Sequence, residues 1–121
     1  MIKFMNNKPV TVYGDGSKVR DFVYAGYVSK AIMYGIGKQI SGIFNVGTGV
    51  GTTTLQLLET IKKVLDKKAE IIWEKERIGD SRSRIVSINK LKTQIGFSPE
   101  TTLEKGITYL REYLMTRLNV A

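Results

Sequence analysis

Residues 42–61 read GIFNVGTGVGTTTLQLLETI, and this stretch decides the fold class. Its first part, GIFNV, is a short apolar run bounded by glycine, which is typical of a β-strand. Thr53 and Gln56 then have the spacing of a capping box, in which each side chain accepts a hydrogen bond from the main-chain N–H of the other residue. We therefore expect a helix to begin there. A strand that leads through a glycine loop into a helix predicts an α/β fold.

The same alternation of strands and helices continues on both sides of this stretch. PVTVYG (9–14), RDFVY (20–24) and AEIIW (69–73) have the composition of strands. Apolar residues at spacings of three and four predict further helices. The first of these helices is expected to bury Val28, Ala31, Ile32 and Ile36. The second is expected to bury Ile88, Leu91 and Ile95 and to end at Gly96. The last is expected to bury Leu103, Ile107, Leu110 and Leu114 and to begin with Thr101 and Glu104 as a second capping box. No repeat or linker interrupts the pattern, so we expect residues 1–121 to form a single domain.

The composition excludes several kinds of chemistry. The chain has 121 residues and a net charge of +8, and it contains neither cysteine nor histidine. A disulfide framework, a zinc site with Cys or His ligands and a histidine-activated nucleophile are therefore excluded, and we expect no metal site. Because no apolar run is long enough for a membrane span and no signal peptide is recognised, we expect a cytoplasmic protein without a membrane partner.

The positive charge favours an anionic partner, which could be nucleic acid, a phosphorylated metabolite or an acidic protein surface. The basic residues are dispersed and form no recognised nucleic-acid motif, so nucleic acid ranks last. ERIGDSRSR, residues 76–84, groups Arg77, Arg82 and Arg84 around Asp80. Such a loop could bind a dianion or could be a solvated turn. For Arg82 and Arg84 we favour a role in surface solubility.

The glycine loop GTGVGT, residues 47–52, has two interpretations. Free main-chain N–H groups at a junction between a strand and a helix can bind phosphate. The loop is not G-x-G-x-x-G and no lysine follows it, so close packing of the helix is the favoured interpretation. We therefore assign no cofactor-binding residue to this chain.

Four segments together resemble the second half of the nucleotide-sugar epimerases and dehydratases, a group of the extended short-chain dehydrogenase/reductase family that includes UDP-glucose 4-epimerase. They are VYGDGSKVRDFVY (12–24), GIFNVGTGVGTTTLQLLETI (42–61), ERIGDSRSRIVSINKLKTQIGFSP (76–99) and TTLEKGITYL (101–110). The resemblance runs from about Pro9 to Leu114. It implies an α/β fragment that combines part of a Rossmann-like fold with the small substrate-binding lobe and lacks the N-terminal dinucleotide-binding half.

The resemblance also implies the site residues. Arg20 of the RD pair and Arg77 of the R-x-GD loop correspond to arginines that bind the substrate diphosphate, and Asp80 corresponds to the acid that accepts hydrogen bonds from the ribose hydroxyls. A planar guanidinium matches phosphate oxygens well, and the implied ligand is a UDP- or dTDP-sugar. The alternatives are an ion pair of Arg20 with Asp21 at a strand start, and a local ion pair of Arg77 with Asp80 in a solvated turn.

The glycine-rich NAD motif and the catalytic Tyr-x-x-x-Lys pair of the family lie in its first half, and we expect neither in this chain. Tyr27 and Lys30 are three residues apart rather than four, so we reject them as the catalytic pair. We therefore assign no catalytic residue, expect the chain to be inactive alone, and expect NAD as the cofactor of the complete family enzyme only.

In the family, residues equivalent to 9–47 pack on the nucleotide-binding sheet, and those equivalent to 48–121 belong mainly to the substrate lobe. An isolated copy is therefore expected to expose apolar surface. The alternative function is a truncated relative that serves as an association module. Its partner would be a second copy in a homodimer or a complementary cofactor-binding half.

Overall fold

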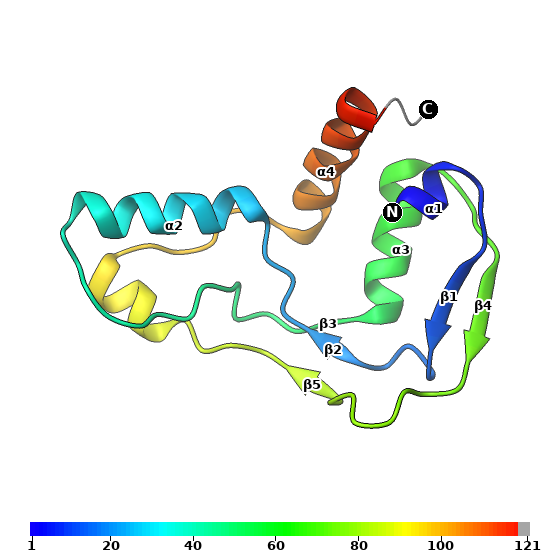
Figure 1. Ribbon diagram of the computed structural model, residues 1–121, viewed down its shortest axis with the longest axis horizontal. Coiled ribbons are helices and arrows are strands. Elements are labelled where there is room, and N and C mark those ends of the chain that lie inside the picture. The colour runs from blue at the N-terminus through cyan, green and yellow to red at the C-terminus, as the bar shows by residue number, and fades with distance from the viewer. Residues whose placement is uncertain (119–121) are drawn as a thin grey trace.

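The computed structural model describes residues 1–118. In chain order its elements are α1 (Ile2–Met5), β1 (Val10–Tyr13), β2 (Val19–Arg20), α2 (Ala25–Gly37), β3 (Thr52–Thr53), α3 (Thr54–Leu65), β4 (Ile71–Glu74), β5 (Ser83–Arg84), the π-helix η1 (Leu91–Ile95) and α4 (Leu103–Leu118). Figure 1 shows α2 at one end of the molecule, β1 and β4 at the other, and the short strands β2, β3 and β5 between them. The α/β class predicted from the sequence is confirmed.

The strands form two small sheets. β1 pairs in parallel with β4, from Val10 opposite Ile71 to Tyr13 opposite Glu74. β2 is the central strand of the other sheet, antiparallel to β3 and parallel to β5. These parallel pairings join segments that are distant in the sequence, and they bring the loop between β4 and β5 close to β2.

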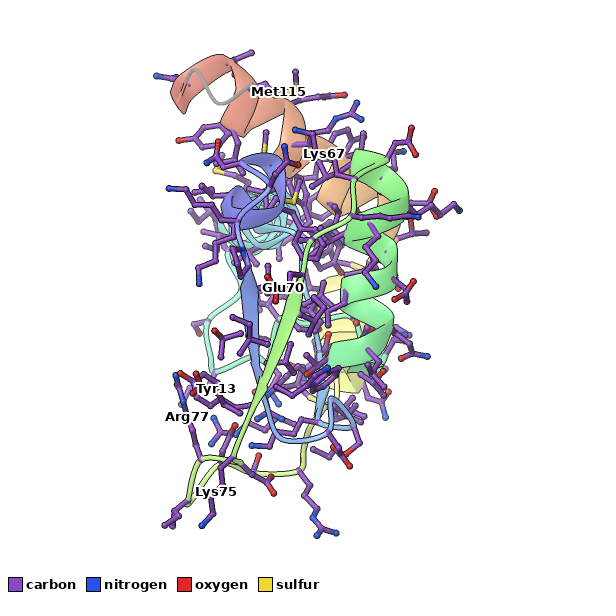
Figure 2. All side chains as sticks on the ribbon, turned by 90° about the vertical axis from the view of Figure 1, so that its right-hand side faces the viewer. Tyr13, Lys67, Glu70, Lys75, Arg77 and Met115 are labelled. Atoms are coloured by element: carbon purple, nitrogen blue, oxygen red, sulfur yellow. The ribbon has the colours of Figure 1, made fainter. Side chains whose placement is uncertain are left out.

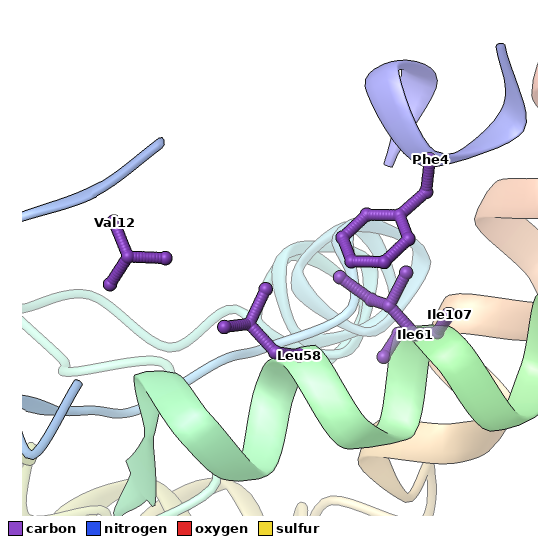
Figure 3. Packing of buried hydrophobic residues seen from close by; sticks show 5 residues of the cluster. All are labelled: Phe4, Val12, Leu58, Ile61 and Ile107. Carbon is purple, nitrogen blue, oxygen red and sulfur yellow. The ribbon is translucent and has the colours of Figure 1, made fainter. Parts of the chain in front are cut away.

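The first hydrophobic core surrounds α3. Phe4 of α1, Val12 of β1, Leu58 and Ile61 of α3 and Ile107 of α4 are buried together (Figure 3). The two α3 residues are three positions apart, so one face of this helix is buried. Burial stabilises the fold by roughly 1.5–3 kcal/mol for a side chain of this kind. This core therefore fixes β1 and α3, which flank the candidate site.

The second core lies between α2 and the segment that contains η1. Ala31 packs with Ile88, Leu91 and Ile95, and Gly96 ends η1 in the left-handed conformation with φ 72°, as predicted. Both cores combine residues from before and after position 47. The division into residues 9–47 and 48–121 concerns packing in the relatives and stays a prediction.

The start of α3 confirms the capping box. Thr53 Oγ1 accepts a hydrogen bond from Gln56 N at 3.0 Å, and Gln56 Oε1 accepts one from Thr53 N at 2.8 Å. The next residue, Thr54, donates its N–H to the carbonyl of Lys18 at 3.0 Å. The capped end of α3 is thereby tied to the chain segment just before β2.

The expected capping box of α4 is wrong. Thr102 Oγ1, and not Thr101, accepts a hydrogen bond from a main-chain N–H of the first turn, that of Lys105 at 3.3 Å. The Glu104 carboxylate pairs with Lys63 of α3 at 3.0 Å. The Glu104 side chain, which the local pattern assigned to the cap, therefore contacts the neighbouring helix α3 instead.

The predicted strand GIFNV, residues 42–46, is not formed. Within residues 1–118 it pairs with no other strand, and Ile43 is 89% exposed. A strand is stable only where its N–H and C=O groups pair with a neighbour, and the described part of the chain supplies none at this place. RDFVY likewise contributes only Arg20 to a strand.

The buried face of α2 also differs from the prediction. Tyr27 and Ala31 are buried, whereas Ile32 and Ile36 are 56% and 65% exposed, together with Met33 at 65%. The helix meets the η1 segment through its Tyr27 and Ala31 side, and a second apolar side has no partner among residues 1–118. The exposed apolar surface that we expected is therefore present. No helix in the described residues is both long and apolar enough to cross a membrane.

Candidate functional site

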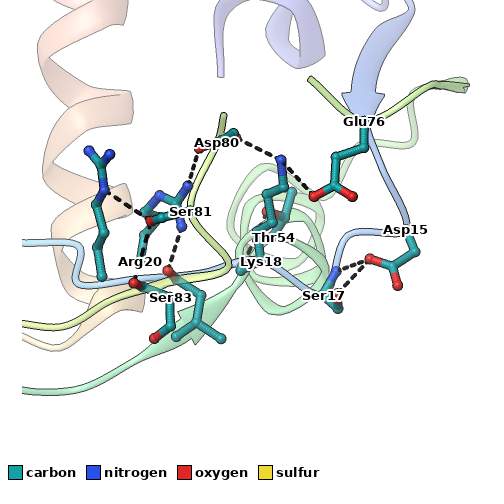
Figure 4. A network of polar contacts seen from close by, with 11 residues as sticks. Asp15, Ser17, Lys18, Arg20, Thr54, Glu76, Asp80, Ser81 and Ser83 are labelled. Carbon is teal, nitrogen blue, oxygen red and sulfur yellow. Dashed lines mark hydrogen bonds and ion pairs between the residues drawn. The ribbon is translucent and has the colours of Figure 1, made fainter. Parts of the chain in front are cut away.

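Arg20 and Asp80, sixty positions apart, meet in one polar cluster. Pairing of β2 with β5 begins with a hydrogen bond from Val19 N to Arg82 O at 2.9 Å, which brings the loop before β5 against β2. The Arg20 guanidinium then donates from Nη2 to Asp80 Oδ1 at 2.6 Å (Figure 4). Asp80 therefore has a partner outside its own loop, while the role of both residues in binding stays a prediction.

Lys18 is the member of the cluster that the sequence analysis missed. Its ammonium Nζ lies 2.8 Å from Asp80 Oδ2 and 3.1 Å from Glu76 Oε1. Its side chain is only 9% exposed, and it is the single buried charged residue among positions 1–118. One signal could have found it, because residues i and i+2 of an extended segment share a face and Lys18 stands two positions before Arg20.

The electrostatics keep this cluster ionised. The hydrogen bond from Lys18, followed by the charges of Lys18 and Arg20, holds the pKa of Asp80 below its usual value against the opposing effect of desolvation. The hydrogen bond to Asp80 is in turn the main cause that raises the pKa of Lys18. The Lys18–Asp80 pair is therefore held in its charged form, and an anion that binds Arg20 would have to compete with Asp80.

Arg77 does not join Arg20. Its Cζ atom lies 3.9 Å from the centroid of the Tyr13 ring, in a cation–π contact at the end of β1 (Figure 2). The alternative of a local ion pair between Arg77 and Asp80 is not what the structure shows, because Asp80 pairs with Lys18 and Arg20. Arg84 donates from Nε to Ser81 Oγ at 3.0 Å and so takes no part in the cluster.

A hollow of about 380 Å³ adjoins the cluster. Lys18, Arg20 and Asp80 supply its charged side, Thr54 adds a hydroxyl, and residues of β1 and of the first core form the rest. This volume falls in the range of roughly 300–1,000 Å³ that is usual for small-molecule sites. The arrangement can present cations to an anionic group and a carboxylate to a hydroxyl donor.

A larger cavity of about 620 Å³ lies between the β2–α2 connection and α4. Aromatic residues such as Phe22, Tyr24 and Tyr109 line it, and no Asp, Glu, Lys or Arg side chain of the described residues does so. It is larger than the hollow at Arg20, but no charged side chain of the described residues lines it. We therefore place the candidate anion site at the smaller hollow.

Asp21, the second residue of the RD pair, holds the glycine loop. Its carboxylate accepts hydrogen bonds from Thr48 N at 2.8 Å and Gly49 N at 2.9 Å, and one from the Thr48 hydroxyl. Burial opposes the charge, but these hydrogen bonds hold the pKa of Asp21 below its usual value. The two loop N–H groups are thus occupied, and a Cβ at Gly47 would clash with Val86 Cγ2. Both observations favour the packing role of this loop over phosphate binding.

The rejection of Tyr27 and Lys30 as a catalytic pair agrees with their surroundings. Tyr27 is buried beside the second core, where its ring stacks on Phe97 with 4.6 Å between centroids. Burial raises the pKa of its hydroxyl, and Lys30 is exposed. Neither residue lies in the cluster of Lys18, Arg20 and Asp80.

Tyr34 and Lys38 do have the spacing of Tyr-x-x-x-Lys, so the expectation that this chain lacks the pattern is wrong on the sequence itself. Both residues serve packing at the end of α2. The Tyr34 ring lies against Phe97 with 5.1 Å between centroids, and Lys38 Nζ donates to Ile95 O at 2.8 Å. The lysine is thereby committed to a carbonyl of η1, and we assign the pair no catalytic role.

Comparison with known proteins finds similarity over nearly the whole chain. UDP-glucose 4-epimerase of Thermotoga maritima, in a crystal structure with UDP-glucose, is 32% identical with a TM-score of 0.88; the match covers 97% of this chain and 38% of that one. UDP-glucose 4-epimerase of Thermus thermophilus, in complex with NAD, is 31% identical with a TM-score of 0.85, over 95% of this chain and 38% of that one. No protein-family model matches.

The similarity extends to enzymes with other reactions. UDP-glucuronic acid decarboxylase 1 of Arabidopsis thaliana is 32% identical over 99 residues, which are 82% of this chain and 23% of that protein. The chain therefore spans 38% or less of the length of each of these three relatives. It corresponds to one segment of such proteins.

Proposed function

Because this chain is homologous to a segment of the UDP-glucose 4-epimerase-like enzymes of the extended short-chain dehydrogenase/reductase family, we propose that it forms the nucleotide-sugar-binding portion of an enzyme of this kind. The ligand is a UDP-sugar or a dTDP-sugar. The complete enzyme is an NAD-dependent epimerase or dehydratase, and this portion is not catalytic by itself.

The observation that carries the proposal is the convergence of Arg20 and Asp80 beside the hollow. Arg20 is the group for the diphosphate, since its guanidinium can donate two parallel hydrogen bonds to phosphate oxygens. Asp80 is ionised and can only accept hydrogen bonds, which suits it to ribose hydroxyls. Arg77 is the second phosphate ligand, and to reach that role it has to leave the Tyr13 ring.

NAD has no site that we can assign within residues 1–118. The N–H groups of Thr48 and Gly49, at the junction that could have received a phosphate, donate to Asp21. When bound in a complete enzyme, NAD supplies hydride transfer. The residues of this chain contribute the binding and orientation of the nucleotide portion of the substrate.

Calorimetric titration of the chain with UDP-glucose, dTDP-glucose and NAD tests the proposal. We expect a nucleotide sugar to bind and NAD to give no heat of binding. Absence of heat with both nucleotide sugars, from a protein whose circular dichroism shows it to be folded, contradicts the proposal.

A second candidate function, association, is favoured by the exposed apolar side chains of α2. Ile32, Met33 and Ile36 are more than half exposed, and Ile43, which follows this helix in the sequence, is 89% exposed. Such a concentration of apolar side chains is typical of a surface that binds protein. The partner is a second copy of this chain or a complementary cofactor-binding half.

Multi-angle light scattering measures the association directly. A dimer that Ile36→Glu converts into a monomer supports this second candidate. Ile78→Glu is the matched control, since Ile78 is fully exposed in the loop after β4 and is expected to leave the mass unchanged. A monodisperse wild-type monomer at high concentration contradicts self-association.

A further inference from the structure

Lys18 is held more firmly than the other members of the polar cluster. Its carbonyl accepts hydrogen bonds from Thr54 N at 3.0 Å and Thr54 Oγ1 at 3.4 Å, which fix it against the start of α3. Its side chain is 9% exposed, whereas that of Arg20 is 26% exposed. The ammonium therefore has little freedom to leave, and Arg20 is the cation that an incoming ligand meets.

The two oxygens of Asp80 are divided between these cations. Oδ2 accepts from Lys18 at 2.8 Å, and Oδ1 accepts from Arg20 at 2.6 Å (Figure 4). The Asp80 side chain is 37% exposed. One oxygen is thus anchored on the buried side of the cluster, and the other is bonded to a group that solvent reaches.

We propose that Lys18 is a positioning residue of the nucleotide-sugar site: it holds Asp80 by Oδ2 so that a diphosphate can take over Arg20 while Oδ1 becomes free for a ribose hydroxyl. The inference rests on the proposed function and deepens it. Lys18 acts on the ligand through Asp80.

The need for such a residue follows from charge. A diphosphate beside Arg20 brings negative charge close to Asp80, and like charges at this distance favour protonation or displacement of the carboxylate. A protonated Asp80 would lose its purely accepting character. Lys18 and Arg20 face Asp80 directly. Glu76 contacts the ammonium group of Lys18, and Arg77 lies at the start of the loop that carries Asp80. Once phosphate occupies Arg20, Lys18 is the cation that remains on Asp80.

Glu76 makes the assignment specific to Asp80. It contacts Lys18 at 3.1 Å through a side chain that is 52% exposed, and the hollow is lined by Asp80 and not by Glu76. Glu76 therefore serves as a second anion for the buried ammonium. Its removal is expected to leave the Lys18–Asp80 contact in place.

A double-mutant cycle on UDP-glucose binding tests the inference, with calorimetry on the wild-type chain, Lys18→Met, Asp80→Asn and the double variant. Loss of a hydrogen bond between charged groups leads us to expect about ten-fold weaker binding for each single variant. Because Lys18 acts through Asp80, the double variant should bind no worse than Asp80→Asn, to within about two-fold. Lys18→Arg, which keeps a cation, should retain most of the affinity.

Lys63→Met is the matched control, because Lys63 pairs with Glu104 at the surface and is 70% exposed. Should Lys18→Met fail to fold by circular dichroism, Lys18→Gln replaces it, since its amide donates a hydrogen bond without a charge, and the same pattern is expected. An equal loss for Lys18→Met with and without Asp80 overturns the inference, and so does wild-type affinity of Lys18→Met. If the wild-type chain binds no nucleotide sugar, the proposed function fails and the inference fails with it. If the wild-type chain binds but the losses of the two single variants are additive, only the positioning role of Lys18 is overturned.

Discussion

Arg77 lies over the ring of Tyr13, with its Cζ atom 3.9 Å from the ring centroid, whereas Arg20 pairs with Asp80. The family resemblance assigns both arginines to one diphosphate, yet Arg20 bonds to Asp80 and Arg77 contacts the last residue of β1. A phosphate that recruits Arg77 therefore has to replace a cation–π contact that is already present. The two arginines should contribute unequally to binding.

Arg77→Ala is expected to weaken UDP-glucose binding by a smaller factor than Arg20→Ala, about three-fold against about ten-fold or more. The reason is that Arg77 gives up its contact with Tyr13 when it binds phosphate. Tyr13→Leu removes that contact while keeping an apolar side chain, and it should leave the affinity unchanged or slightly higher. Equal losses for the two arginine variants in calorimetry would contradict this ordering.

Arg20 itself should not be replaceable by lysine. Arg20→Lys keeps the charge but loses the planar fork that donates to Val19 O and Asp80 at the same time. We expect an affinity for UDP-glucose well below that of wild type and closer to that of Arg20→Ala. Arg84→Lys is the control in the neighbouring strand, since Arg84 bonds to Ser81 outside the cluster. A lysine variant with wild-type affinity would show that charge alone is sufficient.

The parts of this fold that the sequence predicted correctly are those with local causes. The reciprocal hydrogen bonds of Thr53 and Gln56 need only a three-residue spacing. The left-handed Gly96 likewise ends η1 because of its own conformational freedom. The strand at residues 42–46 and the inward position of Ile36 required neighbours, and no such neighbours exist within residues 1–118.

The candidate site divides in the same way. Arg20 and Asp80 were proposed from motifs, whereas Lys18 was missed although it stands two positions before Arg20. Its contact with Asp80 forms only through the pairing of β2 with β5, across about sixty residues. Spacing alone would also have been misleading, because Tyr34 and Lys38 match a catalytic pattern and yet pack against the η1 segment. The sequence therefore indicated site residues that belong to one short motif, and it did not indicate contacts that form only when distant segments pack together.

Asp21 should make the stability of the chain sensitive to acid. Its folded pKa lies below the unfolded value of about 3.9, so its contribution is fully present above that value and is lost as the pH falls through the folded pKa. Asp21→Asn should lower the unfolding free energy at pH 7, because an amide cannot accept from both Thr48 and Gly49 as a carboxylate does. Between about pH 4 and pH 2 the variant should then lose less stability than wild type. Urea titrations across this range give the comparison, and parallel curves would contradict the role of Asp21.

The helix caps give a prediction in which the structure and the sequence pattern disagree. Thr53→Ala should destabilise the chain by about 1 kcal/mol, the usual cost of a lost N-cap. Thr102→Ala should also cost stability, by a smaller amount, since its hydrogen bond to Lys105 N is 3.3 Å long. Thr101→Ala, which the sequence pattern would place at the cap, should change the unfolding free energy little. Urea denaturation of the three variants separates the alternatives, because a larger loss for Thr101→Ala than for Thr102→Ala would restore the capping box with Glu104.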